Sequence, residues 1–107
     1  IHSRDVARGM MHMVQNKVNV PVNLGSGTGI SIKTIVDIIV AKCGKDIQVK
    51  WDTTKPSGDK LRILDTTRAT SKGFNIETSI EKGIEETISW FEANKETIDE
   101  RFNAFKK

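Results

Sequence analysis

Apolar residues recur at helical spacing in three stretches of the chain, and the middle stretch is the most regular. Residues 32–43 carry a single stripe made of Ile32, Ile35, Val36, Ile39, Val40 and Cys43. Spacings of three and four place these side chains on one face of a helix. Ser31 is a suitable N-cap for this helix, and Gly44 is a suitable residue to end it. The pattern therefore predicts a helix over 32–43.

Two further helices are predicted on the same grounds. The first covers about 4–16, with Ser3 as its N-cap and a buried face formed by Val6, Met10, Met13 and Val14. The second covers 79 to about 94, and its apolar face consists of Ile80, Ile84, Ile88 and Phe91. Thr78 followed by Glu81 has the spacing of a capping box. Gly83 costs a helix interior roughly 1 kcal/mol relative to Ala, so it indicates close packing against another element.

Extended segments are predicted between these helices. Residues 22–24 form a predicted short strand after the break at Pro21, and residues 47–51 alternate with Ile47, Val49 and Trp51 on one face. A third extended run at 62–65 leads into a short helix, capped by Asp65 or Thr66 and ending at Gly73. The expected fold is therefore mixed α/β, with three to five helices, two or three short strands and no complete Rossmann domain. It forms one domain over 1–107, and residues 95–107 are a possible helical tail.

Cations gather in the polar stretch between the second and third helices. Lys55, Lys60 and Arg62 surround a turn made of Pro56, Ser57 and Gly58. Proline fixes φ and glycine frees it, so such a turn can hold cations in a set geometry. Arg suits bidentate contact with phosphate and Lys acts as a point charge, so the stretch is a candidate anion site. The alternative interpretation is a solvated basic loop between two elements.

Four segments in order resemble one enzyme family. They are IHSRDVARGM (1–10), VNLGSGTGISI (22–32), DTTKPSGDKLRILDTTRA (52–69) and GFNIETSIEKGIEETISWF (73–91). Together they resemble the C-terminal, substrate-binding part of nucleotide-sugar epimerases, dehydratases and reductases of the extended short-chain dehydrogenase/reductase family. Within it, the GDP-L-fucose synthases look most similar. The resemblance covers nearly the whole chain.

The resemblance implies a set of substrate-binding residues. The segment 55–58 matches the family's Lys-Pro-x-Gly, and a cation at the position of Arg62 meets the nucleotide diphosphate. Leu61 departs from the pattern, since GDP-fucose synthases often carry Arg there. Asp59 follows Gly58 as in the Arg-x-Gly-Asp of UDP-sugar epimerases, although Pro56 replaces their Arg, so the base stays open. The predicted substrate-binding residues are Lys55, Pro56, Ser57, Gly58, Asp59 and Arg62.

Catalytic and cofactor motifs of the family are missing from this sequence. It contains no tyrosine, hence no Tyr-x-x-x-Lys pair, and the glycines of residues 25–29 do not match G-x-G-x-x-G. We therefore expect a nucleotide-sugar-binding region that is not catalytic alone. NAD or NADP, the catalytic residues and a Rossmann half are expected in the intact enzyme. The alternative is a non-catalytic interaction module or a homodimer.

Composition and charge bear on which partners, compartment and metal sites are expected. The net charge is +3, but the cations form no long stripe with interleaved aromatics, so nucleic acid is not expected as a partner. No apolar run approaches the ~20 residues of a membrane span, so no membrane partner is expected. A single cysteine, Cys43, is compatible with the reducing cytoplasm and is expected to be buried. His2 and His12 have no third ligand at a metal-binding spacing.

Overall fold

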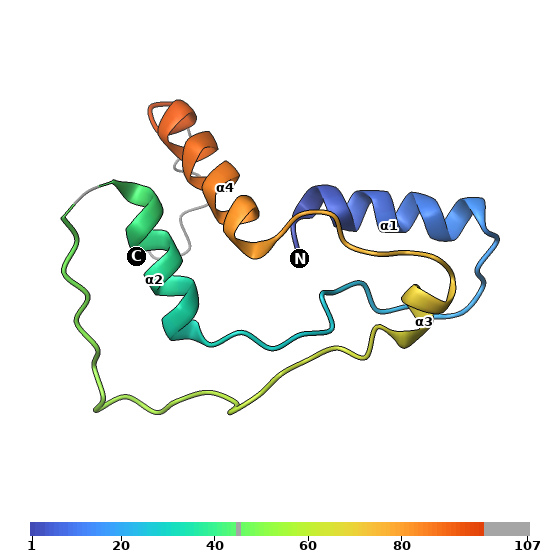
Figure 1. The fold of residues 1–107 in the computed structure, drawn as a ribbon, viewed down its shortest axis with the longest axis horizontal. Coiled ribbons are helices and arrows are strands. Elements are labelled where there is room, and N and C mark those ends of the chain that lie inside the picture. The colour runs from blue at the N-terminus through green and yellow to red at the C-terminus, as the bar shows by residue number, and fades with distance from the viewer. Residues whose placement is uncertain (45, 98–107) are drawn as a thin grey trace.

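Helices are the only regular secondary structure among the described residues. The computed structural model describes residues 1–44 and 46–97. Along the chain it contains α1 (Ser3–Gln15), α2 (Ile32–Cys43), α3 (Thr67–Ser71) and α4 (Ile80–Asn94), shown in Figure 1. No strand occurs within these ranges, so the predicted mixed α/β class is wrong.

The predicted strands do not form because the segments expected to build them have no pairing partner. Residues 22–24 and 47–51 lie in elongated, non-helical stretches, as the alternation suggested. A strand also needs a neighbouring backbone to accept and donate hydrogen bonds. No backbone–backbone hydrogen bond joins either segment to another part of the described chain. Alternating side chains alone do not supply that partner.

The helix ends show which capping predictions hold. α2 has the predicted bounds: Oγ of Ser31 accepts the N–H of Thr34 at 3.0 Å, and Gly44 ends the helix with φ 62°. α1 is capped by His2 instead of Ser3, since the His2 Nδ1 accepts the N–H of Arg4 at 3.2 Å.

At the other two helices, the predicted cap of α4 is wrong, whereas that of α3 is confirmed, with Thr66 at the N-cap position. α4 begins after Ser79, whose Oγ accepts the N–H of Lys82 at 3.2 Å, so the predicted Thr78–Glu81 capping box is not the cap. Before α3, the Asp65 carboxylate accepts the N–H of Thr67 at 2.9 Å. The predicted tail at 95–107 falls largely outside the described residues, and residues 95–97 form turns.

A small core forms where α1 packs on Leu24 and on the segment that follows α3. Phe74 and Ala69 are each only 2% exposed. Gly9 of α1 faces Phe74, and a Cβ there would lie 2.8 Å from Leu24 and 2.9 Å from the Phe74 ring. The guanidinium of Arg8 covers the same ring at 4.9 Å from its centroid. Glycine therefore lets α1 approach this ring closely.

The second packed unit is the pair α2 and α4 (Figure 1), and α4 also meets the start of α1, where Arg4 lies 3.0 Å from Glu86. Nζ of Lys42 on α2 contacts Glu85 on α4 at 2.8 Å. Gly83 of α4 is buried against His2 and Thr78, which confirms the close packing predicted for it.

No described helix is long and apolar enough to cross a membrane.

Many apolar side chains remain uncovered. The radius of gyration is 17.2 Å, whereas a self-contained domain of this length has about 13 Å. Several large apolar side chains are largely exposed, among them Met10 and Val14, which were predicted to be buried; the others are Met11, Trp51, Trp90 and Phe91. Cys43 is half-buried. Helical spacing marked these faces as apolar correctly, but the described chain supplies too little surface to cover them.

Candidate functional site

The candidate site is the cation loop, which we define as residues 55–62. It lies in the long non-helical segment that runs from α2 to α3 around the edge of the molecule (Figure 1). All six predicted site residues are exposed within it. A Cβ on Gly58 would meet no atom within 4 Å, so the turn stands free of the rest of the described chain.

One ion pair lies inside the cation loop. Nε of Arg62 is 3.4 Å from Oδ2 of Asp59, and the two side chains are 85% and 66% exposed. Such a pair is weak because water screens it. Lys55 and Lys60 have no ion-pair partner within the described part of the chain. The loop therefore presents two unpaired ammonium groups and one weakly paired guanidinium.

Just before the loop, Asp52 stabilises a local turn and is not a candidate binding residue. Its Oδ1 accepts the hydroxyl of Thr54 at 2.6 Å and the backbone N–H of the same residue at 3.0 Å. These bonds lower the pKa of Asp52 below its ordinary value. The carboxylate thus stays charged and fixes a turn at the entrance to the cation loop.

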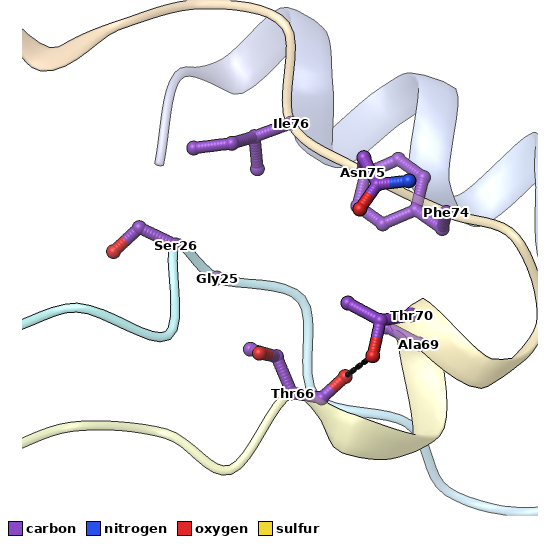
Figure 2. A pocket seen from close by; sticks show the side chains of 8 residues that line it. All are labelled: Gly25, Ser26, Thr66, Ala69, Thr70, Phe74, Asn75 and Ile76. Carbon is purple, nitrogen blue, oxygen red and sulfur yellow. Dashed lines mark hydrogen bonds between the residues drawn. The ribbon is translucent and has the colours of Figure 1, made fainter.

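The two cavities found in the described structure lie elsewhere. The larger, of about 730 Å³, is mainly apolar and is lined by α4, Ile39 of α2, the start of α1 and parts of the connecting segments. The smaller, of about 150 Å³, lies between the 25–26 turn, α3 and residues 74–76 (Figure 2). None of the six predicted residues lines either cavity. The structure brings those residues together on one loop but not into a cavity.

Asp5 has a larger structural role than its place in the first turn of α1 suggested. The side chain is almost fully buried, and its Oδ2 accepts the N–H of Thr78 at 2.9 Å. Oδ1 accepts the N–H of Glu77 at 3.2 Å and lies 2.8 Å from Arg8. The adjacent guanidinium is the main cause of a pKa well below the usual range for this carboxyl. Asp5 thus ties α1 to the segment that leads into α4.

That role could not be read from the sequence, because the partners lie more than 70 residues away. An acid in the first turn of a helix is favourable in any fold, so the sequence carries only the local signal. The long-range bonds go to backbone groups, which leave no residue pattern at their own positions.

The glycine turn, defined as residues 25–29, is the segment whose glycines do not match the dinucleotide fingerprint. Gly27 alone of its glycines has a positive φ, of 70°. The turn lies against the end of the cation loop: a Cβ on Gly29 would be 2.9 Å from Leu61. Its glycines thus serve a contact within the chain.

The two histidines are engaged in contacts between segments. His2 caps α1, and its Nε2 lies 3.7 Å from Glu86. Nε2 of His12 is 2.7 Å from the carbonyl oxygen of Lys72. Among the described residues, no group of three or more potential ligands could hold a metal ion.

Similarity to known proteins places the chain in an enzyme family. It is 32% identical to a putative GDP-L-fucose synthase 2 of Arabidopsis thaliana over 68% of this chain. It is 27% identical to the GDP-L-fucose synthase of Escherichia coli over 90% of this chain, and 31% identical over 91% to a putative UDP-glucose 4-epimerase of Methanocaldococcus jannaschii. No family model and no solved structure matches the chain.

The matched regions cover a small share of these relatives. The chain spans 22% of the Arabidopsis protein, 33% of the Escherichia coli protein and 32% of the archaeal protein. The sequence-based assignment is confirmed at the level of the family. The chain belongs to the NAD-dependent epimerase/reductase family, as a relative of GDP-L-fucose synthases that matches a C-terminal part of them.

Proposed function

We propose that this chain is the nucleotide-sugar-binding region of an NAD(P)-dependent sugar epimerase or reductase. The observation that carries the proposal is the exposed cation loop in a relative of GDP-L-fucose synthases. Relatives are named for enzymes that act on GDP-, dTDP- and UDP-linked sugars. A nucleoside diphosphate is the part that these ligands share. Positive groups on a loop suit that diphosphate.

Each cation would contribute differently to the diphosphate. The ammonium groups of Lys55 and Lys60 act as point charges, whereas the planar guanidinium of Arg62 can donate two parallel hydrogen bonds. Holding the diphosphate anchors the ligand while its hexose reacts elsewhere, which is a positional contribution to rate. Hydride transfer would be supplied by NAD or NADP bound outside the residues described here, together with the catalytic tyrosine and lysine of an NAD-binding half.

Direct titration tests this proposal. The chain is titrated with GDP, UDP and dTDP at low ionic strength, in parallel with Arg62→Ala and Lys55→Ala. We expect binding that weakens in both variants and falls as salt is raised, because exposed charges are screened. A matched control is Lys33→Ala, which removes an exposed cation of α2 that pairs with Asp37 at 2.6 Å, far from the loop in sequence. Equal affinity in all four proteins, or none in the unmodified chain, would overturn the proposal.

A second candidate function is an interaction module, favoured by the uncovered apolar side chains. Trp90 and Phe91 on α4 are 59% and 51% exposed, and Val14 on α1 is 73% exposed. Apolar exposure on this scale marks a surface that another polypeptide covers. Light scattering over a range of concentrations tests it. Self-association without any nucleotide binding supports this function over the first, and a monomer that binds GDP supports the first.

A further inference from the structure

The glycine turn approaches the end of the cation loop more closely than an ordinary residue would allow. A Cβ on Gly29 would lie 2.9 Å from Cδ1 of Leu61 and 3.1 Å from Cδ1 of Ile63. Carbon atoms that do not share a bond prefer separations of about 3.5–4.0 Å. The missing side chain of Gly29 therefore provides the space in which these two residues lie.

Further contacts continue along the same two segments in an antiparallel sense. Gly29 meets residues 61 and 63, whereas Gly27 and Gly25 meet Thr66. Figure 1 shows the two segments side by side on the way to α3. At the far end, Nδ2 of Asn23 donates to the carbonyl oxygen of Asp65 at 3.1 Å. The C-terminal end of the cation loop is thus held against the glycine turn.

The other end of the loop is not held in this way. A Cβ added to Gly58 would have no atom within 4 Å, and the neighbouring residues are exposed. Arg62 lies between Leu61 and Ile63, the two residues that contact Gly29. The side chains on both sides of Arg62 thus pack on the glycine turn, whereas the contact of Arg62 with Asp59 is weak.

We propose that Gly29 is a positioning residue for the diphosphate site. It does not touch the ligand. By having no side chain, it sets the path of residues 61–63 and hence the place that the guanidinium of Arg62 can reach. The proposal rests on the function proposed above, and it adds a determinant of affinity outside the cation loop.

The first test compares two alanine substitutions in the glycine turn. Neither Gly25 nor Gly29 has a positive φ, so alanine is free of backbone strain at both. At Gly25 the new Cβ would lie 3.5 Å from Thr66 and 3.7 Å from Leu64, which is ordinary contact. We expect Gly29→Ala to weaken GDP binding about tenfold, as for a misplaced binding group, while Gly25→Ala leaves it unchanged.

A second set of variants separates positioning from general damage. Leu61→Ala with Ile63→Val removes both crowding Cδ1 atoms, and Leu61 is 71% exposed, so folding should tolerate the change. Combined with Gly29→Ala, this pair should restore most of the GDP affinity, although Gly29→Ala alone weakens it. If Gly29→Ala does not fold, the combined variant is compared directly with the Leu61→Ala/Ile63→Val pair, and it should bind GDP at least as tightly.

The outcomes distinguish the two proposals. If the unmodified chain binds GDP and Arg62→Ala weakens it, but Gly29→Ala behaves like Gly25→Ala, the positioning role is wrong and the proposed function remains. Failure of the combined variant to recover affinity likewise overturns the positioning role. If the unmodified chain does not bind GDP, the proposed function falls, and the positioning role falls with it.

Discussion

The cation loop carries its own counter-charge, because Asp59 lies three residues before Arg62 and contacts it. Sequence alone placed Asp59 among the substrate-binding residues. That role stays a prediction, and the observed contact suggests a second one, since a carboxylate beside the guanidinium competes with an anionic ligand. We therefore expect Asp59 to limit the affinity that the cations supply.

Replacing Asp59 by Asn should strengthen GDP binding. The change removes a negative charge from the site and frees Arg62, and the gain should reach up to about fivefold, the range of an exposed ion pair. Calorimetric titration at low salt measures it. A loss of affinity would show instead that the carboxylate contacts the ligand, for example at a ribose hydroxyl.

A second effect of a single residue is the contribution of Asp5 to the pH dependence of stability. Its folded-state pKa is lowered, chiefly by Arg8, and an unfolded Asp has a pKa of about 3.9. The stabilisation is therefore complete above about pH 4 and is lost as the pH falls through the folded-state value. Asp52 and Asp65, whose pKa values are also lowered, act in the same direction.

Melting temperatures from about pH 6 down to about pH 2.5 check this dependence. Asp5→Asn should melt lower than the unmodified chain at the upper end, and the difference should shrink as the acid limit is approached. Asp52→Asn is measured in parallel and should show a smaller difference of the same sign, because its carboxylate makes only local bonds within a turn. A constant difference across the range would contradict the role given to Asp5.

At the scale of elements, local signals in the sequence were sufficient to predict the bounds of α2. They were insufficient to predict the structure of the segments around it. α2 has an N-cap, a stripe and an αL glycine in one continuous run of residues, so its bounds follow from neighbours. The predicted strands depended on pairing partners that the sequence does not identify. For α4, Thr78 and Ser79 are both good caps by residue type; Ser79 is the cap, and the backbone N–H of Thr78 is bound by Asp5.

Ser79→Ala should destabilise the chain by about 1 kcal/mol, the usual cost of losing an N-cap. The N–H of Lys82 would lose its acceptor. Urea unfolding followed by circular dichroism measures the change. Glu81→Ala is the matched control and should have little effect, because no capping box forms. An equal loss in both variants would contradict the assignment of Ser79 as the cap.

For the whole molecule, the family could be predicted from four ordered segments, but the position of the site relative to the cavities could not. The six predicted residues are neighbours in sequence, so their common loop was foreseeable. Whether the loop borders a cavity depends on how α2 and α4 pack, which is a long-range property. The open shape and the uncovered apolar faces are consistent with a region whose binding surface is completed by further polypeptide.

Mapping where GDP contacts the folded chain is the decisive test of the proposed function. Backbone amide resonances of the isotope-labelled chain are followed by NMR while GDP is added. We expect shifts that saturate and cluster at residues 55–62, with smaller changes in the glycine turn. Shifts confined to the residues around the large apolar cavity, or no saturable shifts at all, would contradict it.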